Sequence, residues 1–243
     1  MLSPAKASYQ RKLAAQAAGK TSAQGAPAMP EEGPVATEYQ QLLAALGVDL
    51  RELGNIMGTD RKIEAKRKMI AKYLPWVEGA LAGDGGAQDE IVVTMLIWAI
   101  DTADWPRALD LAGYVLRHGL ALPERYQRKP ATLIAEEFAE AGLVNPPLVD
   151  LETLRQVAAL TAEHDMHDQV RAKLEKATGL AFKAQADAFD PEAESAPAGG
   201  KGALVDAALT HFNRALQLHS ACGVKKLIEG LERERRALAD KAT

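Results

Sequence analysis

The densest positive charge in this chain lies between residues 61 and 72. The cations of this segment are Arg61, Lys62, Lys66, Arg67, Lys68 and Lys72. At about 100° per residue, Arg61, Lys68 and Lys72 share one side of a helix, opposite Ile63 and Ile70. A helix with a cationic outer face can bind phosphate groups without reading a base sequence. The alternative is an ordinary solvated helix face, which these residues taken alone favour.

A second pair of cations, Lys225 and Lys226, opens the last predicted helix. The beginning of a helix suits phosphate binding, because its backbone N–H groups are unpaired there. Glu229, Glu232 and Glu234 follow at once, so a solvated face is again the simpler interpretation.

The segment His164-Asp165-Met166-His167-Asp168 offers four side chains that could bind a metal. Two histidines at positions i and i+3 can bind zinc, but a zinc site needs further ligands. A new helix begins here, and Asp165 or Asp168 as its N-cap would explain the carboxylates. We therefore predict no metal site.

Three carboxylate pairs could be imagined as a nuclease centre: Asp89-Glu90, Asp101 with Asp104, and Glu136-Glu137. Adjacent helical side chains point about 100° apart, so solvated faces and helix caps explain these pairs better. The phosphate-binding pattern G-x-x-x-x-G-K-[ST] and the nucleophile pattern G-x-S-x-G are both absent from the sequence. We predict no catalytic residue and no cofactor in this chain.

The elements that carry these residues are predicted to be helices throughout. The chain of 243 residues is rich in Ala and only 5% aromatic, which favours helices over strands. Apolar periodicity and cap signals predict an all-α fold with helices over 38–50, 61–82 with a break at Pro75, 87–103, 104–118, 130–141, 151–162, 168–184, 203–220 and 224–238.

Gly- and Pro-rich stretches suggest how the chain is divided. We expect a mostly disordered arm and linker over 1–37, in which 1–18 can form a short fraying helix. A helical core domain over 38–187 and a flexible loop over 188–202 follow. A helical hairpin over 203–243 is then expected to pack on the core. Ala208-Leu209 repeats the frame of Ala108-Leu109, which suggests a tetratricopeptide-like hairpin, although any packed helical pair uses such residues.

Charge, cysteine content and apolar run length indicate which binding partners and which cellular compartment to expect. The net charge is −4, yet residues 1–75 carry 11 Lys and Arg against 7 Asp and Glu, which permits a nucleic-acid contact near the N-terminus. The single Cys222 allows no internal disulfide. The longest apolar run, 91–100, is about half the length that a membrane span needs. No secretory signal is evident, so we expect a cytoplasmic protein without membrane contact.

Several short motifs together resemble the small terminase subunit family of P-two-like tailed phages, also called the terminase endonuclease subunit. The resemblance covers most of residues 38–238 in order, and the Ala188–Gly202 insertion departs from it. The motifs are Ser3-Pro4-Ala5, Leu74-Pro75-Trp76-Val77, Gly86-Ala87-Gln88-Asp89, Trp98, Asp101-Thr102, Ala108-Leu109, Tyr114, His118-Gly119-Leu120, Asp165-Met166, Val170-Arg171-Ala172-Lys173-Leu174, Thr178-Gly179-Leu180, Arg214-Ala215-Leu216-Gln217-Leu218, Gly223-Val224-Lys225-Lys226 and Leu231-Glu232-Arg233-Glu234.

The resemblance implies a role in packaging phage DNA into proheads, in the cytoplasm of the bacterial host. It implies double-stranded phage DNA at the cohesive-end site, the large ATPase and nuclease subunit, and further copies of this chain in a ring as partners. The DNA-binding candidates are then Arg61, Lys62, Lys66, Lys68, Lys72, Lys225 and Lys226. Two alternatives stay open, a metal-dependent endonuclease in its own right and a repeat-like helical adaptor that binds only protein. Whether this chain is itself an enzyme is therefore left open.

Overall fold

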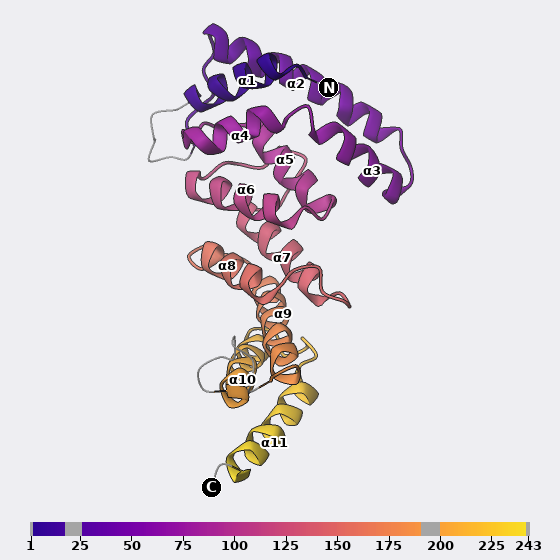
Figure 1. The fold of residues 1–243 in the computed structure, drawn as a ribbon, viewed down its shortest axis with the longest axis vertical. Helices are drawn as coiled ribbons and strands as arrows, with labels where there is room; N and C mark the ends of the chain where they lie inside the picture. Colours follow the sequence, from indigo (N-terminus) through magenta and orange to yellow (C-terminus); the bar gives the residue numbers. More distant parts are fainter. Residues whose placement is uncertain (1, 18–25, 191–199, 242–243) are drawn as a thin grey trace. The chain divides into compact units, whose positions relative to one another are not determined.

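The computed structural model describes residues 2–17, 26–190 and 200–241. Within these ranges the chain forms eleven helices and no β-strand, which confirms the all-α prediction (Figure 1). The chain divides into two compact units, residues 1–130 and residues 131–243. None of the described helices is both long and apolar enough to cross a membrane.

Unit 1 is organised around one fully buried helix. Its helices are α1 (Pro4–Gln16), α2 (Gly33–Gly54), α3 (Thr59–Ile70), α4 (Leu74–Gly83), α5 (Glu90–Asp101) and α6 (Trp105–His118). Every residue of α5 from Ile91 to Ile100 is buried, and α2, α3, α4 and α6 all contact this helix. The apolar sequence of 91–100 therefore reflects a helix that is covered on all sides.

The first helix packs closely on α4. A Cβ atom added to Gly79 would lie 2.7 Å from the Cα of Arg11, and one added to Gly83 would lie 2.5 Å from the Cα of Ala15. Small residues on both helices thus allow the two backbones to touch. The buried carboxylate of Glu38 on α2 accepts a hydrogen bond from Gln10 at 2.8 Å and pairs with Lys6.

The helix expected within residues 1–18 is present as α1, but it packs into unit 1 instead of fraying as part of a disordered arm. The sequence gives little sign of this packing, because Gly and Ala contacts leave no apolar periodicity. α2 also begins at Gly33, inside the expected linker, whereas residues 18–25 of that linker lie outside the described residues.

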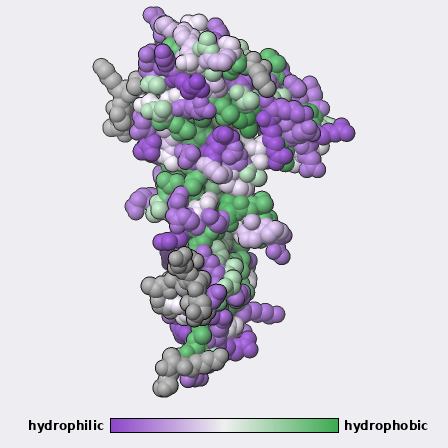
Figure 2. Space-filling view, in the orientation of Figure 1, coloured by the Kyte–Doolittle hydropathy of each residue, from purple (hydrophilic) through white to green (hydrophobic). Residues whose placement is uncertain are grey.

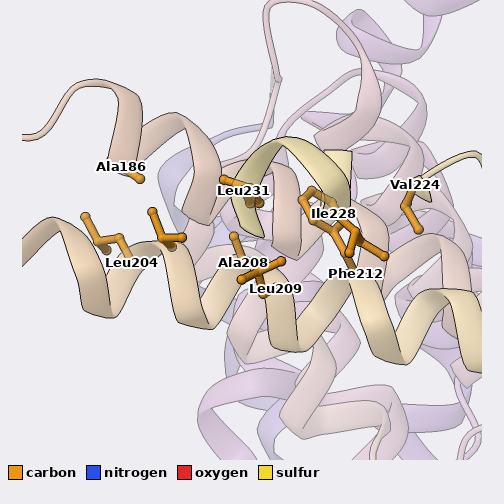
Figure 3. Packing of buried hydrophobic residues seen from close by; sticks show 9 residues of the cluster. Ala186, Leu204, Ala208, Leu209, Phe212, Val224, Ile228 and Leu231 are labelled. Carbon is orange, nitrogen blue, oxygen red and sulfur yellow. The ribbon is translucent and has the colours of Figure 1, made fainter. Parts of the chain in front are cut away.

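Unit 2 contains the remaining helices: α7 (Pro130–Leu143), which begins at the boundary, α8 (Leu151–Thr161), α9 (Asp168–Asp187), α10 (Gly200–Leu218) and α11 (Lys225–Lys241). α10 packs extensively along α9 and also against α11. Figure 3 shows the apolar core that the three helices share. A Cβ atom on Gly179 of α9 would lie 2.7 Å from the ring of Phe212, so the α9–α10 contact also depends on a missing side chain.

The observed division differs from the expected one. The boundary at Pro130 and Ala131 falls inside the expected core domain of 38–187, because α9 places its apolar face on α10. Helices α10 and α11 do pack together at the C-terminal end, but their tetratricopeptide-like character stays a prediction. Most of the expected loop, residues 191–199, lies outside the described residues.

Local signals located most helix ends correctly. The chain breaks between α3 and α4 at residues 71–73, just before the predicted Pro75, which lies in the first turn of α4. Asp104 caps α6, and Gly119 ends it with a φ of 66°. Asp60, however, does not cap α3. Gly58 occupies the N-cap position, and Asp60 lies in the first turn.

We expect Gly79→Ala to destabilise unit 1 by roughly 1–3 kcal/mol, because the new methyl group would collide with the backbone of α1. Gly47→Ala is the matched control, since its Cβ atom would meet only the flexible side chain of Arg51 at 3.6 Å. Urea unfolding followed by tryptophan fluorescence reports on this unit, because Trp76, Trp98 and Trp105 all lie in it. Equal stability of the two variants would contradict the close α1–α4 packing.

Candidate nucleic-acid interface

Two of the cations on α3 attach this helix to the end of α5. The ammonium group of Lys66 lies 2.5 Å from a carboxylate oxygen of Asp101. The guanidinium group of Arg67 donates a hydrogen bond to the carbonyl oxygen of Thr102 at 3.2 Å. The carbonyl groups at a helix C-terminus lack intrahelical partners and carry partial negative charge, so two cations are favourable there. Lys66 and Arg67 therefore fix the position of α3.

A third cation, Lys72, pairs with a buried carboxylate of α2. Its Nζ lies 2.7 Å from Asp49, whose side chain is only 4% exposed. The hydroxyl group of Tyr73 donates to the other oxygen of Asp49 at 2.6 Å. A buried carboxylate without such partners would be costly, so this arrangement supports the fold. Lys72 is thus not a free member of the predicted cationic stripe.

The remaining candidates on α3 are more accessible. Lys68 pairs with Glu64 one turn away at 2.8 Å, but both side chains are well exposed. The charge and hydrogen bond of Lys68 hold the pKa of Glu64 below its usual value. Arg61 and Lys62 form no ion pair with any residue in the described ranges. Figure 2 shows hydrophilic side chains gathered over α3.

The predicted stripe nevertheless faces a groove of mixed charge. Arg61, Lys68 and Lys72 line a groove of about 350 Å³ between α2 and α3. Asp49, Glu52 and Glu64 line the same groove. The cations of the predicted stripe therefore lie beside carboxylates of α2 and α3, and their role in DNA binding stays a prediction.

The second predicted pair lies in unit 2. Lys225 and Lys226 are exposed in the first turn of α11 and form no ion pair with a residue that the structure describes. The two predicted sets therefore belong to different units.

Three of the candidate carboxylates, Asp89, Asp101 and Asp104, support the fold. Asp89 is the N-cap of α5 and accepts hydrogen bonds from the backbone N–H groups of Ile91 and Val92. It also accepts one from the indole N–H of Trp76 at 2.7 Å. Asp104 caps α6, and Asp101 pairs with Lys66.

The histidine-rich segment does not form a metal centre in the structure. Among the described residues, no group of three or more His, Cys, Asp or Glu side chains is arranged to hold a metal ion. His167, rather than Asp165 or Asp168, occupies the N-cap of α9. The expected capping role of these aspartates is therefore wrong, and Asp168 lies in the first turn of the helix.

Asp49 has a role in the structure that was not predicted from the sequence. This residue follows Leu42 and Leu46 and precedes Leu53 on the buried side of α2. A charged residue within an apolar helical stripe implies a charged or hydrogen-bonding partner. That signal could have indicated in advance that a nearby cation is not free.

Asp89 should make the stability of unit 1 depend on pH. Burial, which outweighs its three hydrogen bonds, raises the pKa of Asp89 from 3.8 to about 6. Because the folded state has the higher pKa, the stabilisation linked to proton binding is complete at low pH and disappears as the pH rises through 6. The free energy of unfolding of the wild type minus that of Asp89→Asn should fall by about 2 kcal/mol between pH 4.5 and 7.5. Urea titrations at these pH values measure it, and a constant difference would contradict this role of Asp89.

The amino-acid sequence is similar to members of one protein family. The family model for the phage small terminase subunit matches residues 43–169. The chain is 40% identical over 202 residues to the terminase, endonuclease subunit of Escherichia phage P2, covering 82% of this chain and 75% of that protein. It is 29% identical over 226 residues to the probable terminase, endonuclease subunit of Haemophilus phage HP1, covering 86% of this chain and 75% of that protein. No solved structure matches the chain. The chain therefore belongs to the phage small terminase subunit family.

Proposed function

We propose that this chain recognises double-stranded phage DNA at the cohesive-end site and presents it to the large terminase subunit for cutting and packaging. Membership of the small terminase subunit family supports this role. The observation that supports the DNA contact is that the cations on α3 and just after it have different partners. Lys66, Arg67 and Lys72 hold the helix in place, whereas Arg61, Lys62 and Lys68 are available on a fixed support.

A phosphate contact needs a cation whose charge is not already neutralised. Arg61 and Lys62 meet this condition among the described residues, and the exposed Lys68–Glu64 pair can exchange for phosphate at little cost. Lys66 and Lys72 are assigned a positioning role, because each has a carboxylate partner. Lys225 and Lys226 form a second candidate contact on α11.

The proposed assembly is a closed ring of identical subunits in the cytoplasm of the bacterial host. Each added subunit would repeat the cations of α3, so a ring would bind DNA more tightly than a single chain. The relatives are named as endonuclease subunits. In this proposal, cutting belongs to the complex with the large subunit, and this chain supplies recognition.

The test is the salt dependence of DNA binding by the full chain. Arg61→Gln/Lys62→Gln/Lys68→Gln should weaken binding to all duplex sequences by a similar factor. It should also flatten the plot of log K against log salt by roughly 0.9 per lost phosphate contact. Surface substitutions of this kind usually cost less than about 0.5 kcal/mol each, so folding should be retained.

Arg155→Gln/Arg214→Gln/Arg236→Gln removes the same charge from three exposed arginines of unit 2 and is the control. Lys225→Gln/Lys226→Gln tests the second contact separately. The α3 assignment fails if the first variant retains both the affinity and the salt slope of the wild type. Wild-type protein that binds no duplex at low salt would overturn the proposed function itself.

A further inference from the structure

The turn between α2 and α3 exposes an apolar side chain that the fold does not use. Met57 is 93% exposed, the highest value among the large apolar side chains that the structure describes. The described residues that line the open surface hollow at this turn are Asn55, Ile56, Met57, Gly58, Thr59, Asp60 and Arg61. Figure 1 shows this turn at the outer end of the α2–α3 pair.

The backbone of the turn is held in place although its tip is exposed. The N–H group of Asn55 donates to the carbonyl oxygens of Arg51 and Glu52, and that of Ile56 donates to Leu53 at 3.2 Å. On the other side, the N–H of Lys62 donates to the carbonyl oxygen of Gly58 at 3.1 Å. Met57 is therefore presented outward from a defined turn.

The neighbours of Met57 indicate what it meets. A protein interface would normally extend over a broader apolar area, but Ile56 and Met57 are the only large apolar residues among the described residues that line this hollow. Arg61 and Lys62 follow within one turn of α3 and form no ion pair with described residues. One carboxylate, Asp60, also lies in this turn, so the two cations leave it with a net positive charge. An exposed apolar side chain beside a net positive charge matches proteins that insert a wedge between base pairs from the minor groove.

We propose that Met57 enters the minor groove of duplex DNA as an apolar wedge and bends the duplex while Arg61 and Lys62 hold the flanking phosphates. This inference rests on the proposed DNA-binding function and adds a mode of contact to it. Partial unstacking of one base step costs free energy, and burial of the methionine side chain in the groove offsets part of that cost. Such a contact responds to the deformability of the DNA and not to a base pattern.

The test compares full-length Met57→Ala, Met57→Leu and wild type on a duplex of the cohesive-end sequence. Fluorescence energy transfer between the duplex ends reports bending, and 2-aminopurine emission reports unstacking. Met57→Ala should abolish both signals and weaken binding roughly tenfold, whereas Met57→Leu should retain them. Val48→Ala, a change at an exposed apolar residue on α2 and outside the turn, is the control and should behave as wild type.

The outcomes separate this inference from the proposed function. Wild-type binding without bending or unstacking, or Met57→Ala with unchanged signals, overturns the wedge while leaving DNA recognition in place. A change in oligomer mass for Met57→Ala, with normal bending by the remaining complex, would assign Met57 to a protein contact and also overturn it. Absence of DNA binding by the wild type overturns both.

Discussion

Unit 1 depends on the burial of α5 on every side. The side chains of α5 from Ile91 to Ile100 are all buried, so neighbouring helices must cover this helix on every side. The unpaired backbone N–H and C=O groups at its two ends must also find hydrogen-bond partners inside the protein. Asp89 supplies hydrogen-bond acceptors at the beginning of α5, and α3 supplies Lys66 and Arg67 at its end. The position of the candidate DNA-binding helix therefore follows from the requirements of the core.

This arrangement explains why the cations of α3 are not equivalent. Lys66 and Lys72 pair with Asp101 and Asp49, which stabilises the fold and largely neutralises their charge. Charges at the beginning of α3 face solvent, where a phosphate group can reach them. A basic segment in a sequence can thus serve two purposes, and only the positions of the carboxylates around it separate them.

Local sequence signals predicted the helices well, because capping and helix termination depend on a few neighbouring residues. Asp104, Gly119 and Pro130 mark helix ends in the sequence and in the structure. The packing of α1 on α4 was not predictable, since Gly79 and Gly83 act through the absence of side chains. Asp49, the partner of Lys72, lies 23 residues away on α2. The sequence around Lys72 therefore could not show that this cation of the stripe has a buried carboxylate partner.

In this account, Lys66 and Arg67 hold the C-terminal half of α3 against α5, while Arg61 and Lys62 in its first turn, with the exposed Lys68, contact DNA. Hydrogen–deuterium exchange of the full chain, with and without duplex DNA, tests this claim directly. DNA should slow exchange of the backbone amides of residues 59–64, while the amides of Ile91–Ile100 should exchange most slowly in both states. Protection by DNA confined to α9, α10 and α11, with residues 59–64 unchanged, would contradict the claim.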